Sequence, residues 1–193
     1  MAQTKLSRPS ARDRILATAS DLFYKEGVQN VGIDRIIAES GVAKMSLYNN
    51  FKSKDALIAA YLEQYDKNWN PWFQEKVEQL ADNPGDRLLA IFDVLHTWFQ
   101  EPNFRGCAFV NTTVELANSN HPGYDVAVKH KQAILAYIRS LVEAANLAHP
   151  NTLAQQLAIL IEGAIVVAMM GQGANAAIQA KDAATTLMTA SKK

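Results

Sequence analysis

The stretch GVAKMSLYNNFKSK, from Gly41 to Lys54, constrains the fold more than any other part of the chain. Gly41 ends a helical apolar pattern in the way that a residue in the left-handed conformation ends a helix. A second helix begins almost at once, and in it Leu47 and Phe51 lie one turn apart, so both can face a core. The stretch therefore predicts a helix, a tight turn and a very short second helix.

The side chains that face outward on this short helix combine a cation, hydroxyls and an amide. Such groups suit phosphates and base edges, whereas a solvated helix face more often carries Glu and Lys four residues apart. We therefore predict that the helix binds DNA, with Lys44 and Lys54 at phosphates and Asn49 at an adenine edge. For Arg35, pairing with Glu39 one turn later is the alternative. The predicted DNA contacts are Arg35, Lys44, Met45, Ser46, Tyr48, Asn49 and Lys54.

The segment IIAESGVAKMSLYNNFKSK, residues 36–54, resembles the helix-turn-helix signature of TetR-type (tetracycline-repressor-like) transcriptional regulators. Gly32 departs from the family, which usually has Thr or Ser there, so a side-chain cap and a phosphate contact are missing. Asn50 stands where His is common in the family. The positions that carry the resemblance are Gly41, Val42, Lys44, Ser46, Leu47, Tyr48, Phe51, Ser53 and Lys54.

The resemblance implies an all-α chain of about nine helices. Residues 1–54 would form a three-helix DNA-binding head, and residues 55–193 a larger body for ligand binding and dimerisation. The resemblance further implies a repressor that binds a palindromic operator as a homodimer and is released or repositioned when a small molecule binds the body. The alternatives are a DNA-bound protein that acts through a protein partner, and a redox or electrophile sensor that uses Cys107.

The net charge of the whole chain is zero, but the charge is unevenly distributed. Residues 1–54 hold nine basic and five acidic residues, a net charge of +4, which leaves the remainder at −4. A basic head on an acidic body is typical of a protein whose first part meets nucleic acid. Lys5 and Arg8 precede the first helix and are candidates for an arm along the phosphates; an ordinary solvated tail is the alternative.

Capping residues and apolar periodicity predict where helices begin and end. Ser10 caps a first helix with Asp13 as its partner, Gly27 ends that helix, and Ser53 caps the helix that joins head and body. Pro71 predicts a kink or a restart within the joining helix, because proline removes a backbone donor and clashes with the preceding turn. Further helices are expected at 86–100, 107–117, 124–148 and 153–170, with an Ala-rich helix after residue 173.

The helix expected at 153–170 is apolar all round, so it must be covered on several sides. The resemblance implies that this helix and the Ala-rich helix form a four-helix bundle with a second subunit. A central helix in a monomeric core is the alternative. The predicted interface residues belong to a nearly continuous apolar stripe, and Ile159, Val166 and Val167 make the opposite side apolar as well. The predicted interface residues are Leu157, Ile161, Ile165 and Met169.

The resemblance also implies a small-molecule site in the body. The body sequence contains many large aromatic rings and a few polar groups on otherwise apolar helices, and a buried carboxylate needs a partner that a ligand can supply. For each candidate, packing in the core or a bond across an interface is the alternative. The candidate ligand contacts are Trp69, Phe92, His96, Cys107, Asn111, Glu115 and Glu162.

Other classes of protein are disfavoured. The chain has no Gly-rich phosphate loop, nucleophile elbow or Cys cluster, so we expect no enzyme and no cofactor. Its four histidines share no ligand spacing, so we expect no metal site. Its single cysteine cannot form an internal disulfide and no signal-peptide pattern is seen, so we expect a cytoplasmic protein. Cys107 follows Arg105 at an expected helix start, which favours a thiolate; a small apolar filler is the alternative.

Overall fold

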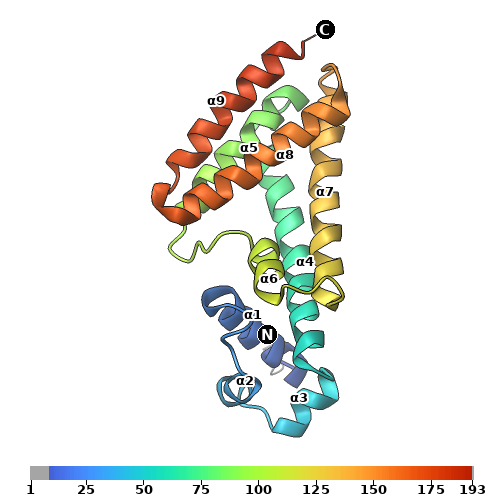
Figure 1. Ribbon diagram of the computed structural model, residues 1–193, viewed down its shortest axis with the longest axis vertical. Coiled ribbons are helices and arrows are strands. Elements are labelled where there is room, and N and C mark those ends of the chain that lie inside the picture. Colours follow the sequence, from blue (N-terminus) through green and yellow to red (C-terminus); the bar gives the residue numbers. More distant parts are fainter. Residues whose placement is uncertain (1–8, 193) are drawn as a thin grey trace, which may run out of the picture. The chain divides into compact units, whose positions relative to one another are not determined.

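The computed structural model describes residues 9–192, which form nine α-helices, one short π-helix and no strand (Figure 1). The predicted all-α fold is therefore confirmed. Lys5 and Arg8, the candidate arm residues, lie outside the described residues. The helices are α1 Ala11–Glu26, α2 Ile33–Ser40, α3 Lys44–Asn50, α4 Lys54–Leu80, α5 Pro84–Phe99, α6 Ala108–Leu116, α7 Pro122–Ala144, α8 Pro150–Val167, η1 Ala168–Gln172 and α9 Asn175–Ala190.

The helices divide into two compact units. The first unit contains the described residues up to Tyr65 together with residues 110–126, and the second contains residues 66–109 and the described residues from Ala127 onward. Helices α4, α6 and α7 each contribute residues to both units. The first unit thus extends beyond residue 54, where the sequence placed the end of the head, because the first turns of α4 pack with it.

The first unit is built on the apolar stripes that the sequence displays. In α1, Ile15, Ala19 and Phe23 are at most 3% exposed, and in α4 the side chains of Leu57 and Leu62 are fully buried. Helix α1 contacts both α2 and α3. Burial of each large apolar side chain contributes on the order of 2 kcal/mol, so packing rather than helix propensity holds these short helices in place.

The predicted helix ends are confirmed in the first unit. The Ser10 hydroxyl oxygen accepts a bond from the Asp13 backbone N–H at 3.1 Å, and Ser53 caps α4 by accepting from the Ala56 N–H at 3.0 Å. Gly27 and Gly41 end α1 and α2 with φ values of 90° and 62°. Residues with a Cβ rarely adopt these backbone conformations, which explains why glycine occupies these two helix ends.

Pro71 does not interrupt the fourth helix. Helix α4 continues through it from Lys54 to Leu80, so of the predicted kink or restart, the restart is wrong. The neighbouring aromatic side chains explain the difference: the ring of Trp69 stacks on that of Phe73 with centroids 4.5 Å apart, and Phe73 is 1% exposed. Continuing the helix keeps this burial, which offsets the loss of one backbone hydrogen bond.

The second unit contains α5, α8 and α9, which pack against one another (Figure 1). Leu157, Ile161 and Ile165 of α8 are at most 5% exposed, so they belong to the core of the chain itself. The prediction that these three residues form a dimer interface is wrong, because the apolar stripe chosen faces inward. Met169, the fourth residue predicted, is 45% exposed.

The opposite side of α8 is both apolar and exposed. Ile159 is 70% exposed and Met170 is 78% exposed, and the spacing of these residues places them along one side of the helix and its continuation. We call the exposed large apolar residues of α8, η1 and α9 the exposed α8–α9 face; its members are Ile159, Val166, Val167, Met169, Met170 and Ile178.

Among the described residues, Pro150–Gln172 is long and apolar enough in composition to cross a membrane. This segment covers α8 and η1. Some of its apolar side chains lie in the core of the second unit and others on the exposed α8–α9 face. A core helix with one uncovered apolar side has the same composition.

Candidate functional site

The turn between α2 and α3 is held by one arginine. Arg14 of α1 donates from Nη1 to the carbonyl oxygens of Ser40, at 3.2 Å, and Gly41, at 3.1 Å. These carbonyls lie at the C-terminal end of α2, where a cation also interacts favourably with the helix dipole. The left-handed Gly41 and this arginine together fix the direction in which the chain enters α3.

Helix α3 presents the side chains that the sequence predicted would face outward. Leu47 is fully buried and Phe51 is 4% exposed, whereas Met45 is 69% exposed and Tyr48 is 41% exposed. Ser46 is half-buried. We call the outward set the α3 surface; its members are Lys44, Met45, Ser46, Tyr48 and Asn49.

Lys44 is available to a phosphate. Its ammonium nitrogen lies 3.4 Å from Asp34 Oδ1, and both side chains are more than half exposed. An ion pair of this kind contributes at most about 1 kcal/mol and exchanges readily with solvent. Phosphate can therefore replace Asp34 as the partner of Lys44 at little cost.

Arg35 is already paired with two carboxylates. Its Nη2 lies 2.8 Å from Glu26 Oε1 and its Nε lies 2.7 Å from Glu39 Oε1. The hydrogen bonds that Arg35 donates to Glu26 and Glu39 raise the pKa of Arg35. The structure thus favours the alternative in which Arg35 pairs with Glu39, and a phosphate contact at Arg35 would have to compete with both carboxylates.

Lys54 is directed toward the turn between α1 and α2. Its Nζ lies 3.5 Å from the carbonyl oxygen of Gln29. Burial lowers the pKa of Lys54, and the carboxylates of Asp55 and Glu115 oppose this effect. Lys54 is therefore half-buried beside the first-unit turn, and it does not share the exposed α3 surface.

Two of the predicted ligand contacts belong to the first unit. Asn111 and Glu115 both lie in the 110–126 segment. Glu115 Oε2 accepts a hydrogen bond from the backbone N–H of Gln29 at 3.0 Å. The structure therefore gives Glu115 a protein partner in place of the predicted ligand, a pairing across 86 residues that no local pattern signals.

An aromatic cluster surrounds a buried histidine in the second unit. His130 is 4% exposed, its Nδ1 lies 2.6 Å from Asp66 Oδ1, and its ring stacks on Phe109 with centroids 3.7 Å apart. The ring of Trp69 meets His130 edge-on at 5.5 Å. Burial lowers the pKa of His130, although the hydrogen bond to Asp66 opposes this effect. The sequence identified Trp69 but missed Asp66 and His130, which lie 64 residues apart.

Among the described residues, two donors next to this cluster are buried without a hydrogen-bond partner. They are Trp69 Nε1 and the hydroxyl of Tyr137, and the ring of Phe73 contacts both residues. An unsatisfied buried donor costs about 1–3 kcal/mol. Each such group calls for an explanation, and a bound water or ligand that accepts a hydrogen bond supplies one.

Two further predicted ligand residues are joined by a lysine. Lys131 Nζ lies 2.6 Å from Glu162 Oε1 and 3.3 Å from Cys107 Sγ. Burial alone would lower the pKa of Lys131, but the charges of Cys107 and Glu162 raise it. The sequence identified Cys107 and Glu162 separately, and missed the lysine that brings them together.

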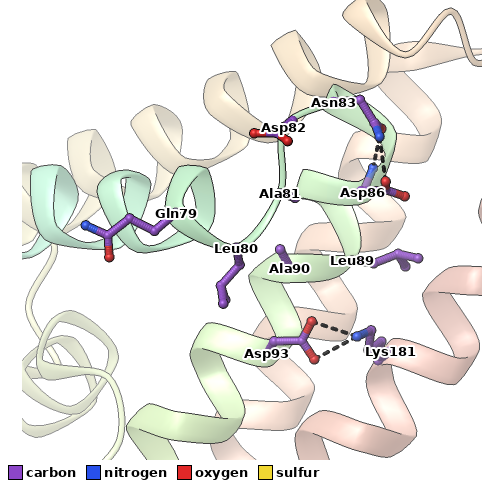
Figure 2. Close-up of a pocket in the computed structure, with 10 residues that line it drawn as sticks. All are labelled: Gln79, Leu80, Ala81, Asp82, Asn83, Asp86, Leu89, Ala90, Asp93 and Lys181. Carbon is purple, nitrogen blue, oxygen red and sulfur yellow. Dashed lines mark hydrogen bonds and ion pairs between the residues drawn. The ribbon is translucent and has the colours of Figure 1, made fainter.

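The remaining predicted ligand residues lie outside the surface hollow. Phe92 is 1% exposed, and His96 is half-buried. A polar hollow of about 470 Å³ lies where α4 meets α5. Figure 2 shows its lining residues, among which Lys181 is paired with Asp93; the two side chains lie 2.7 Å apart. None of the predicted ligand residues lines it. In the part of the chain that the structure describes, no group of three or more His, Cys, Asp or Glu residues is arranged to hold a metal ion.

Two family models match the chain. Residues 15–61 match the model described as "Bacterial regulatory proteins, tetR family". Residues 84–188 match the model described as "Tetracyclin repressor-like, C-terminal domain". The second match alone covers more than half of the chain.

Solved structures and characterised relatives agree with these models. A TetR-family transcriptional regulator from Streptomyces coelicolor is 28% identical, with a TM-score of 0.83 over 95% of this chain and 96% of that chain. A TetR transcriptional regulator from Chloroflexus aurantiacus is 25% identical, with a TM-score of 0.78 over 93% of this chain and 94% of that chain. The HTH-type transcriptional repressor NemR of Escherichia coli is 25% identical over 140 residues, which cover 72% of this chain and 70% of NemR.

Because His130 is buried, we expect the folded chain to lose stability in mild acid. Because its pKa is lowered in the folded chain, the unfolded chain binds a proton that the folded chain does not, and the free energy of unfolding falls as the pH drops below the ordinary histidine pKa of 6.5. Urea denaturation between about pH 7.5 and about pH 5.5 measures this fall. We expect a shallower pH dependence in His130→Gln, with His149→Gln at an exposed position as the control. Equal pH dependence in the wild type and His130→Gln would contradict the prediction.

Proposed function

Because the chain belongs to the TetR family of bacterial regulatory proteins, we propose that it is a ligand-responsive transcriptional repressor that binds a palindromic operator as a homodimer. Members of this family are transcriptional regulators and not enzymes. The observation that carries the proposal is the α3 surface, a short helix with Leu47 buried and with Lys44, Tyr48 and Asn49 exposed. The relative NemR is named as a repressor, which supports repression as the output.

The α3 surface supplies both kinds of DNA contact. A recognition helix of this type lies in the major groove and meets base edges with its exposed side chains. Lys44 would neutralise a phosphate and release condensed counterions, which strengthens binding to every sequence. Asn49 would pair with an adenine edge, Tyr48 would reach the backbone or a thymine methyl group, and Met45 would add an apolar base contact.

The exposed α8–α9 face is the proposed dimer interface. Large apolar side chains grouped on one exposed surface mark a site of protein association. A second copy of the chain is the expected partner, since a two-fold dimer presents two α3 helices to the two halves of a palindrome. This face replaces the buried stripe of Leu157, Ile161 and Ile165 as the surface that a second subunit covers.

The aromatic cluster of the second unit is the proposed effector region. Trp69 Nε1 and Tyr137 Oη are buried among large rings and have no acceptor among the described residues, which suits a partly apolar molecule that carries a hydrogen-bond acceptor. Binding there would release or reposition the DNA-binding helices, because α4, α6 and α7 contribute residues to both units. As a DNA-binding regulator, the protein is expected to act in the cytoplasm.

A sensor role for Cys107 is the second candidate function. The ammonium group of Lys131, 3.3 Å from Sγ, provides the cationic neighbour that reactive cysteines share. In this role an electrophile would bond to the sulfur and alter the contact between Lys131 and Glu162. The proposed output, release from DNA, is the same as for a reversible effector.

Selection of genomic fragments tests DNA recognition. The purified protein is expected to retain fragments with a shared palindromic site at moderate salt. Lys44→Ala should weaken binding to all sequences alike and lower the salt slope by about one, and addition of Tyr48→Ala should abolish specific retention. Lys129→Ala, at an exposed lysine of α7, is the control. Tight specific binding by the double variant would overturn the assignment of the α3 surface.

Charged substitutions test the exposed α8–α9 face. Val166→Glu combined with Met170→Glu should produce a monomer in sedimentation, with unchanged helicity because both side chains are exposed. Binding to a palindromic fragment should weaken, since the two heads are no longer linked. Leu80→Glu alters another exposed apolar residue, on α4, and should leave the mass unchanged. A double variant that remains dimeric would place the interface elsewhere.

Alkylation tests the sensor role of Cys107. Iodoacetamide transfers its carboxamidomethyl group to the thiolate sulfur and releases iodide. We expect the modified wild type to lose DNA binding and Cys107→Ser to be unaffected. Lys131→Gln should react more slowly, because the cation next to the sulfur is removed. Full alkylation without loss of DNA binding would exclude this function.

A further inference from the structure

We propose that Glu115 is a positioning residue for DNA recognition, which anchors the turn between α1 and α2 and thereby sets the orientation of α2 and α3. This inference rests on the proposed function of the α3 surface. It assigns to Glu115 a role outside the effector region where the sequence placed it. The argument concerns the first unit alone, to which both Glu115 and the turn belong.

Glu115 and its backbone hold Gln29 at two points. The carboxylate oxygen Oε2 accepts from the Gln29 backbone N–H at 3.0 Å, and the Glu115 carbonyl oxygen accepts from Gln29 Nε2 at 3.3 Å. Lys54 Nζ lies 3.5 Å from the third polar group of the same residue, the Gln29 carbonyl oxygen. Gln29 is thus bound from α6 and from the start of α4, although it is itself exposed.

The close approach of Glu115 requires glycine at position 27. A Cβ built on Gly27 would lie 2.7 Å from Glu115 Oε2, closer than side chains can approach. Gly27 also has a φ of 90°, so the same residue ends α1 and leaves space for the carboxylate. A side chain at position 27 would therefore displace the Glu115 carboxylate, the flexible end of its side chain, from this position.

Helix α2 depends on this turn because its own N-terminus is uncapped. Gly32 occupies the capping position and provides no side-chain hydrogen bond. Two kinds of contact fix the connection between α1 and α2. Val28 and Val31 are buried in the core, at most 1% exposed, and Glu115 accepts a hydrogen bond from the Gln29 N–H at the surface. Glu115 holds Gln29 and so restrains the connection that leads into α2. In other helices a capping Ser or Thr provides a comparable restraint at the N-terminus.

A change at this turn reaches the DNA-binding helix through α2. Helix α2 has eight residues; Gly41 connects its far end to α3, and the Arg14 bonds fix that end to α1. Helix α2 also contacts α3 directly. A shift at the N-terminal end of so short a helix therefore alters the angle at which α3 is presented. Because Glu115 lies on α6, movement of α6 would release or tighten the same anchor.

Substitution of Glu115 tests the proposal on the full-length protein. Glu115→Ala removes the acceptor, whereas Glu115→Gln retains an oxygen that can accept from the Gln29 N–H. We expect Glu115→Ala to lose affinity for a genomic fragment selected by the wild type by about tenfold, the effect of one hydrogen bond to a charged group. Glu115→Gln should restore most of the affinity. The salt slope should equal that of the wild type, since Glu115 makes no phosphate contact.

Hydrogen exchange of the Gln29 amide gives a readout without DNA. The amide should be protected in the wild type and in Glu115→Gln and should exchange faster in Glu115→Ala. Glu143→Ala, at an exposed glutamate of α7, is the control for both measurements. Unchanged affinity of Glu115→Ala despite faster exchange would overturn the proposal, and so would equal loss of affinity in the Ala and Gln variants. If the wild type selects no DNA, the proposed function fails, whereas the exchange result still decides whether Glu115 holds the turn.

Discussion

Burial of Leu47 beneath α3 determines which side of that helix is available to a partner. Seven residues form too few internal hydrogen bonds for a stable isolated helix, so α3 depends on packing. Phe51, at the end of α3, is also buried, and the guanidinium of Arg12 lies 5.2 Å from the centre of its ring. With these two side chains fixed, the positions of the exposed residues of α3 follow from helix geometry.

Much of the first unit follows from the sequence because its determinants are local. The Ser10 and Ser53 caps, the glycine ends and the inward direction of Leu47 each depend on residues within one or two helical turns. The lysines were harder to interpret. Lys44 forms an exposed ion pair with Asp34, whereas Lys54 lies half-buried beside Gln29, and sequence spacing does not reveal this difference.

The sequence-based predictions fail for contacts between segments that are distant in the sequence. They also fail where one sequence pattern is compatible with two structures. Periodicity shows that α8 is apolar on both sides, but it does not show which side the rest of the chain covers, so Leu157 and Ile161 were assigned to the wrong surface. Glu115 and the Asp66–His130 pair depend on contacts across 86 and 64 residues. A single sequence carries no sign of such contacts.

The unbroken helix α4 contains one place of reduced stiffness. Pro71 has no backbone N–H, so the carbonyl group of Lys67, one turn earlier, lacks the hydrogen bond that regular helix geometry would provide. Bending at that point costs less energy than elsewhere in the helix. A molecule that packs against Trp69 or Phe73 would therefore act next to the turn of α4 that lacks this hydrogen bond.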